Sequence, residues 1–158
     1  MSDDGLMERL RGEGRHAAAG SFGIDRQKAR QKLQKFRLSD PHLYVLEFIQ
    51  TASLLGASWV DIYIDADELE MHFDGEPLEP AELDEIYEAA FGRGTTRRAE
   101  ALRHLAIGLI TAEEIEPAEL VVETAPAEAE GVALTIEAEG EADVAEHPGP
   151  EAGTTCIY

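Results

Sequence analysis

A single carboxylate in an apolar segment is the feature of this sequence that most clearly suggests chemistry. Glu47 is the only charged residue between Pro41 and Leu55. Burying an unpaired carboxylate is costly, so Glu47 must face a cleft, hold a partner or take up a proton. Thr51 follows one helical turn later on the same face. Glu47 is therefore either a catalytic carboxylate or one satisfied by backbone donors or by an arginine such as Arg103.

Two later segments combine glycine with groups that could hold a ligand. Asp74 and Gly75 form either an ordinary turn or a place where the carboxylate contacts a ligand. The loop 92–96 precedes a predicted helix, where a phosphate cradle would need converging backbone amides, and a flexible interhelix loop is the other interpretation. The residues of interest in this loop are Gly92, Gly94, Thr95 and Thr96.

Hydrophobic periodicity predicts the elements that position these residues. A helix is expected over 41–55, because Asp40 can cap it and Gly56 can end it. Apolar side chains occur on almost every side of this helix, which predicts that the helix is buried. Two alternating runs, 59–65 and 68–73, predict an antiparallel hairpin. Further helices are expected over 80–91 and 97–112, strands over 120–124, 132–137 and 154–158, and a loop over 140–153.

The N-terminal part is rich in basic residues. Residues 1–20 show no clean period and are expected to be a mobile lead-in. Residues 25–37 predict a short amphipathic helix, whose basic face is interpreted as solvated surface. One domain is expected over 21–158. Because the last expected strand ends at Tyr158, we hypothesise that the natural protein continues beyond it.

Composition excludes several classes of protein. The chain has 158 residues, the size of one domain, and a formal net charge of −20, which opposes binding to nucleic acid or to anionic membranes. It has no run of the roughly 20 apolar residues that a membrane-spanning helix needs, and its start lacks the pattern of a secretory signal. Its single cysteine, Cys156, is interpreted as a small apolar strand residue. A cytoplasmic protein is expected.

The order of elements and the residues around Glu47 resemble the GHKL ATPase superfamily. That superfamily includes DNA gyrase, the ninety-kilodalton heat-shock chaperone, histidine kinases and the mismatch-repair protein MutL. The segment 46–64 resembles its first motif, Glu-Leu-Val-x-Asn-x-x-Asp-Ala-Gly-Ala. The resemblance implies that Glu47 positions or activates the attacking water, and that Thr51, which replaces the asparagine, contacts Mg²⁺. Leu54 replaces the second acid of the motif.

Two further motifs of the superfamily have partial matches. In the second, Asp-x-Gly-x-Gly, the aspartate accepts a hydrogen bond from the adenine amino group. An ungapped alignment places Phe73 at this aspartate, and a one-residue deletion places Asp74 there. Because strand side chains alternate between faces, the two alignments predict different side chains on the ligand-facing side of the sheet. The glycine-rich lid resembles 92–96 together with Gly108, and Thr154 resembles the threonine of a late Gly-Thr pair.

The resemblance implies an α/β (α+β) two-layer sandwich, a Bergerat-type mixed β-sheet with helices packed on one face. The cofactors that it implies are ATP and Mg²⁺. Because each motif is altered, we favour a degenerate, noncatalytic module that binds or regulates a protein partner. The alternative is a competent ATP-binding domain with slow ATPase activity in a chaperone-like protein. In a third interpretation, the basic segment docks an acidic partner or nucleic acid.

Overall fold

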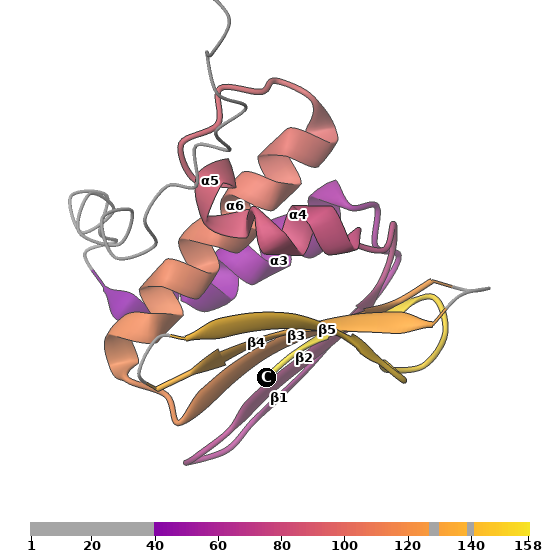
Figure 1. The fold of residues 1–158 in the computed structure, drawn as a ribbon. Helices are drawn as coiled ribbons and strands as arrows, with labels where there is room; N and C mark the ends of the chain where they lie inside the picture. Colours follow the sequence, from indigo (N-terminus) through magenta and orange to yellow (C-terminus); the bar gives the residue numbers. More distant parts are fainter. Residues whose placement is uncertain (1–39, 127–129, 139–140) are drawn as a thin grey trace, which may run out of the picture.

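The computed structural model of the chain describes residues 40–126, 130–138 and 141–158. They form two layers, a six-stranded β-sheet and a group of helices that covers one of its faces (Figure 1). The α+β two-layer sandwich predicted from the sequence is therefore confirmed. The expected lead-in 1–20 and the amphipathic helix 25–37 lie outside the described residues.

The helices follow the predicted signals closely. They are η2 (Pro41–Leu43, a 3-10 turn), α3 (Tyr44–Leu54), α4 (Pro80–Asp84), α5 (Ile86–Ala89), α6 (Arg97–Ala112) and η3 (Glu113–Ile115, a 3-10 turn). The side chain of Asp40 accepts a hydrogen bond from the His42 amide, and Gly56 follows α3 with φ of 84°. The single helix expected over 80–91 is wrong, because the backbone leaves the helical region at Glu85 and two short helices result.

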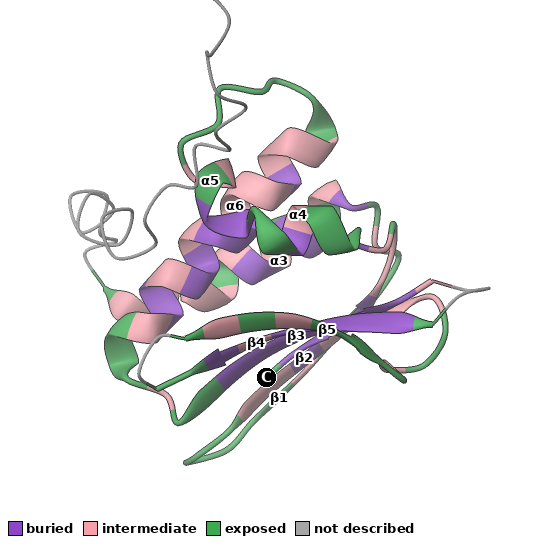
Figure 2. Cartoon of the chain, viewed as in Figure 1, coloured by how far each residue is buried: buried purple, intermediate pink, exposed green. Residues whose placement is uncertain are grey.

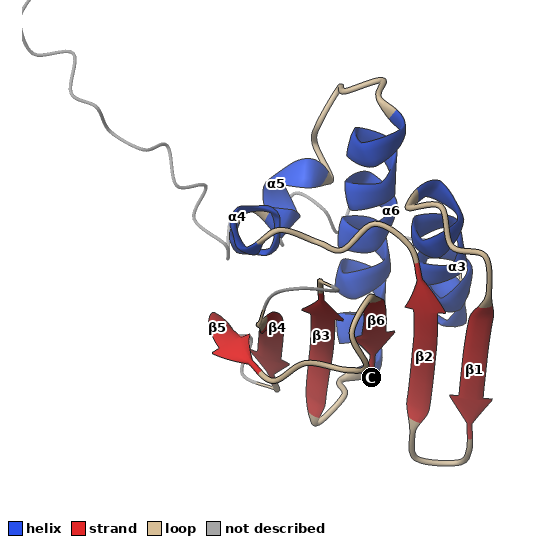
Figure 3. Cartoon of the chain, turned by 90° about the vertical axis from the view of Figure 1, so that its right-hand side faces the viewer, coloured by secondary structure: helices blue, strands red, loops and turns tan. Residues whose placement is uncertain are grey.

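The sheet places the last strand of the chain near its centre. The strands are β1 (Val60–Ile64), β2 (Leu69–Asp74), β3 (Glu119–Ala125), β4 (Gly131–Glu137), β5 (Ala142–His147) and β6 (Thr154–Ile157). Their order is β1-β2-β6-β3-β4-β5 (Figure 3). All pairs of neighbouring strands in this described sheet are antiparallel, so the expected mixture of parallel and antiparallel pairs is wrong.

The hairpin and the other expected strands are confirmed, but the loop expected over 140–153 is partly wrong. It contains the edge strand β5, which pairs with β4. Only two of the β5 side chains, Ala142 and Val144, are half-buried, and the other four are exposed. A strand with so few apolar residues gives a weak alternating pattern, which explains why the sequence did not reveal it.

The core lies between the sheet and the helices (Figure 2). One row of side chains crosses the strands from β2 to β4, and its members Met71, Ile157, Val122 and Leu134 are at most 1% exposed. The helices add Phe48, Leu105 and Leu109, each 0% exposed. The helices and the sheet thus shield these side chains from solvent.

The prediction that the Glu47 helix is buried on all sides is wrong. Phe48, Thr51 and Ala52 are buried, but Leu46 is 55% exposed and Gln50 is also exposed. The reason is that α3 packs along α6 on one side, whereas the side with Leu46 and Gln50 is open to solvent. An apolar composition all round the helix did not reveal which side would be covered.

Candidate functional site

Glu47 pairs with an imidazole from the neighbouring helix. Its Oε2 lies 2.6 Å from Nδ1 of His104 on α6, and the two side chains are 17% and 34% exposed, respectively. When the carboxylate is ionised it can only accept hydrogen bonds, and Nδ1 is then the donor. Of the three fates predicted for Glu47, holding a partner is the one found. The partner is the residue after Arg103, whose own guanidinium donates to the Gly94 carbonyl.

Thr51 and Gly108 lie at the same contact between α3 and α6. Thr51 is 0% exposed, and its hydroxyl lies 2.9 Å from the Glu47 carbonyl and 3.4 Å from the Ala101 carbonyl. Gly108 stands inside α6, where its amide belongs to the helical ladder. A Cβ at this position would come within 2.5 Å of the Phe48 ring. Close packing of two helices therefore explains this glycine.

At the end of the hairpin, Phe73 and Asp74 point to opposite faces of the sheet. Phe73 is 1% exposed and packs in the core, with Thr155 opposite it on β6. Asp74 accepts hydrogen bonds from the Ser58 hydroxyl at 2.6 Å, the Ser58 amide at 2.7 Å and the Trp59 amide at 3.0 Å. These bonds, that of the Ser58 hydroxyl foremost, hold the pKa of Asp74 below its usual value. The side chain between the layers is thus Phe73.

Gly75 and Thr154 flank Asp74. Thr154 is the register partner of Asp74 across β2 and β6, and its hydroxyl donates to the Glu151 carbonyl. Gly75 has φ of 139°, and a Cβ there would lie 3.0 Å from the Leu55 carbonyl oxygen. Only glycine accepts this backbone conformation and this close approach, which bring the chain after β2 against the end of α3.

The glycine-containing loop leads directly into α6. The side chain of Thr96 accepts a hydrogen bond from the Ala99 amide and thereby caps the helix. Thr95 is exposed, and Gly92 and Gly94 are exposed as well. The loop therefore lies at a helix N-terminus, as predicted, but one of the amides that would face an anion is already bonded to Thr96. A role in phosphate binding stays a prediction.

The predicted site residues thus fall into three groups. Glu47, Thr51 and Gly108 meet between α3 and α6; Asp74, Gly75 and Thr154 lie at the end of the β2–β6 ladder; and Gly92, Gly94, Thr95 and Thr96 precede α6. In the described ranges, no group of three His, Cys, Asp or Glu side chains could hold a metal ion. The metal contact expected of Thr51 therefore has no group of such ligands beside it.

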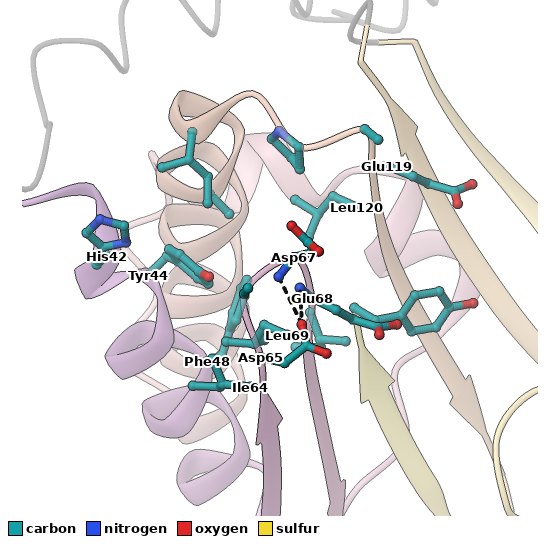
Figure 4. A pocket seen from close by; sticks show the side chains of 17 residues that line it. His42, Tyr44, Phe48, Ile64, Asp65, Asp67, Glu68, Leu69, Glu119 and Leu120 are labelled. Atoms are coloured by element: carbon teal, nitrogen blue, oxygen red, sulfur yellow. Dashed lines mark hydrogen bonds between the residues drawn. The ribbon is translucent and has the colours of Figure 1, made fainter.

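A pocket of about 570 Å³ lies at the opposite end of the hairpin from Asp74 (Figure 4). Four parts of the chain line it: the turn between β1 and β2, the start of α3, the segment that leads from α6 into β3, and the end of β6. None of the site residues predicted from the sequence belongs to this lining. The sequence had shown the acidic turn only as a connection within the hairpin.

His104 is a residue of the candidate site that sequence reasoning did not find. It lies 57 positions from Glu47, so only the packing of α3 on α6 reveals the pair. One signal was present, because His104 precedes Gly108 by one helical turn and therefore shares its face.

Cys156 is interpreted from the sequence as a small apolar strand residue. Cys156 is a free thiol, 3% exposed, on the sheet face that the helices leave open. Burial, and then the nearby Glu123 and Glu70 carboxylates, raise its pKa to about 12. A neutral thiol at this place agrees with the interpretation as a small apolar residue.

No helix within the described ranges is both long and apolar enough to cross a bilayer.

Solved structures share this arrangement of elements, whereas sequences give no match. No family model and no curated protein sequence matches the chain. The chain is similar to a crystal structure of the N-terminal domain of a DNA repair protein, with a TM-score of 0.50 and 15% identity. The similarity covers 84% of this chain and 40% of that one, so the chain spans less than half of that structure's length. At this identity, the likeness concerns the fold alone.

Proposed function

We propose that this chain is a degenerate GHKL-type domain that serves as a binding or regulatory module and does not hydrolyse ATP. The fold likeness to the N-terminal domain of a DNA repair protein supports the superfamily, and so does the sequence pattern around Glu47. The observation that carries the loss of catalysis is the buried Phe73 ring, which stands where the superfamily has its adenine-binding aspartate under the ungapped alignment.

The surroundings of the phosphate and metal positions support the same proposal. The helix α6 continues through Gly108, so the amides there are bonded within the helix rather than free for phosphate oxygens. The Thr51 hydroxyl is buried against helix carbonyls, and the Glu47 carboxylate is held by His104. The adenine, the phosphates and the metal ion of a bound nucleotide would each lack a contact that the superfamily supplies.

The exposed edge of the sheet supports a protein partner for this module. The edge strand β1 has β2 as its only neighbour in the described sheet, and three of its five residues are exposed large hydrophobics: Val60, Tyr63 and Ile64. Trp59, just before it, is 44% exposed. An uncovered edge with apolar side chains can accept a strand from another protein. We expect a protein partner here rather than a nucleotide.

Calorimetric titration of the full chain with Mg-ATP and with Mg-ADP tests the proposal. We expect no saturable heat and no rise in melting temperature with either nucleotide. A clear saturable stabilisation would contradict the proposal and favour the competent ATP-binding domain. Any residual hydrolysis is then compared between the wild type and Glu47→Gln. Equal rates would assign it to a contaminant, whereas its loss in Glu47→Gln would identify a working active site.

A further inference from the structure

The pocket at the hairpin turn has an apolar floor of core side chains and further apolar side chains exposed around it. The floor residues are Phe48, Leu69, Leu120 and Ile157. Three further lining residues belong to the exposed large hydrophobics, Ile64 at 61%, Ile115 at 42% and Tyr158 at 37%. Gathered apolar surface of this kind is costly to leave in water and is typical of a place where another group docks.

Carboxylates surround this floor. Asp65, Asp67, Glu68 and Glu119 line the pocket, and all four are exposed (Figure 4). Asp65 is occupied within the turn, where it accepts the amides of Asp67 and Glu68. Among the described residues, Asp67, Glu68 and Glu119 enter no ion pair. The lining contains no lysine or arginine. The pocket therefore suits an occupant that is both cationic and apolar.

The rest of the described chain does not neutralise this charge. Residues 40–158 contain 28 of the 33 Asp and Glu residues but only four of the 13 Lys and Arg residues. Those four are arginines between positions 93 and 103, in the first half of α6 or just before it. The pocket lies beside the other end of α6, at Ala112.

One segment of the chain has the matching chemistry. Residues 26–37 contain six of the 13 basic residues and no acidic residue. They include the apolar Leu33 and Phe36, and all three lysines of the protein, Lys28, Lys32 and Lys35. The segment thus combines positive charge with apolar side chains, and the pocket combines negative charge with apolar side chains.

The connection between the segment and the pocket is short. Arg37 precedes His42, which lines the pocket, by five residues. Five residues span at most about 17 Å when fully extended. A tether of this length keeps the segment at a high effective concentration near the pocket, which favours contact within one chain over contact between chains.

We propose that residues 26–37 dock in the acidic pocket of the same chain. Leu33 and Phe36 contact its apolar floor, and the lysines approach the carboxylates of Asp67, Glu68 and Glu119. The pocket is then a docking site for a basic segment, and it borders the sheet edge that the proposed function assigns to a partner at Ile64, which belongs to both.

Zero-length carbodiimide cross-linking of the full chain tests this docking, because it joins a lysine amine directly to a carboxylate. All lysines lie in the segment, so every lysine cross-link reports a contact of residues 26–37. We expect links to Asp67, Glu68 or Glu119. A mixture of isotopically labelled and unlabelled protein separates links within a chain from links between chains. Links spread over the 28 carboxylates of 40–158, or links mainly between chains, would overturn the proposal.

Two pairs of variants separate docking from general attraction between opposite charges. Leu33→Ser with Phe36→Ser should abolish the links to the rim, whereas Gln31→Ser with Gln34→Ser should preserve them. Lysine reactivity toward an acylating reagent should rise when Asp67, Glu68 and Glu119 become amides. It should stay low when the exposed Asp84, Glu85 and Glu88, on or beside α4 and α5, are changed in the same way. Equal responses within either pair would contradict the proposal.

Discussion

The chemistry open to a carboxylate on an apolar helix depends on the side chains that surround it. Glu47 has the residue type that the superfamily resemblance assigns to water activation, and its Oε2 is engaged by His104 at 2.6 Å. An imidazole fixed in this way holds a charge-assisted hydrogen bond between two helices. At this scale, the observed role of Glu47 is to join α3 to α6.

A double-mutant cycle on Glu47→Gln and His104→Ala measures this bond. Because the pair is only partly buried, we expect a coupling free energy of about 1 kcal/mol, read from urea unfolding at neutral pH. The matched cycle combines Glu47→Gln with Arg103→Ala, whose guanidinium contacts Gly94 instead. That cycle should give a coupling near zero. Equal coupling in both cycles would contradict the assigned pairing.

Gly108→Ala tests the close contact between the same helices. Alanine favours a helix by up to about 1 kcal/mol over glycine, but its Cβ would lie 2.5 Å from the Phe48 ring. Overpacking of this kind costs about 1–3 kcal/mol, so we expect a net loss of stability in urea unfolding. In a Phe48→Leu background the loss should shrink. The same loss in both backgrounds would exclude the ring as its cause.

At the scale of elements, Asp74 joins the end of β2 to the start of β1. Its carboxylate accepts the Ser58 and Trp59 amides at 2.7 and 3.0 Å, so the chain that leaves α3 is held to the strand beside it. This junction stands at the place where the superfamily resemblance suggested a ligand contact. The aspartate therefore has a structural role that needs no nucleotide.

This role predicts a dependence of stability on pH. The folded-state pKa of Asp74 lies below its value of 3.8 in the unfolded chain, so the folded state favours the ionised form. Its contribution is present above about pH 5 and is lost as the pH falls through the lowered pKa. Urea unfolding across this range should show Asp74→Asn less stable than wild type near neutral pH, with the two converging in acid. Asp61→Asn, on the exposed side of β1, is the control and should show no such convergence.

At the scale of the whole molecule, the last strand connects the two halves of the sheet. Between them, β6 pairs with β2 on one side and with β3 on the other. The β1–β2 hairpin and the β3–β5 meander therefore meet only through residues that come last in the chain. Folding must bring together segments far apart in sequence before the core can close.

Deleting residues 154–158 should therefore prevent cooperative folding. We expect the truncated chain to lose its sharp thermal transition in circular dichroism, because the hairpin and the meander can no longer share one sheet. Tyr158→Ala is the control, since it keeps the backbone and removes only the side chain that donates to Glu123. A truncated chain with an unchanged cooperative transition would contradict this account of β6.

Local signals in the sequence predicted most of the individual elements. The hairpin, the span of α6 and the capping residues Asp40 and Gly56 follow from alternation, period and turn chemistry, which neighbouring residues determine. Predictions failed where distant packing decides. Strand β5 has little apolar pattern of its own, and the apolar Leu46 lies on the exposed side of α3.

The sequence by itself determined the types of the main elements and the position of Glu47 on a helix, because each depends on neighbouring residues. The two-layer class followed from the resemblance of their order to a known superfamily. Only the tertiary structure decided that His104 holds Glu47, that Phe73 rather than Asp74 lies between the layers, and that acidic and apolar side chains from four segments form one pocket. Contacts between segments far apart in sequence leave no local pattern. The physical reason is that burial and charge neighbours are set when layers pack, after the elements themselves are specified.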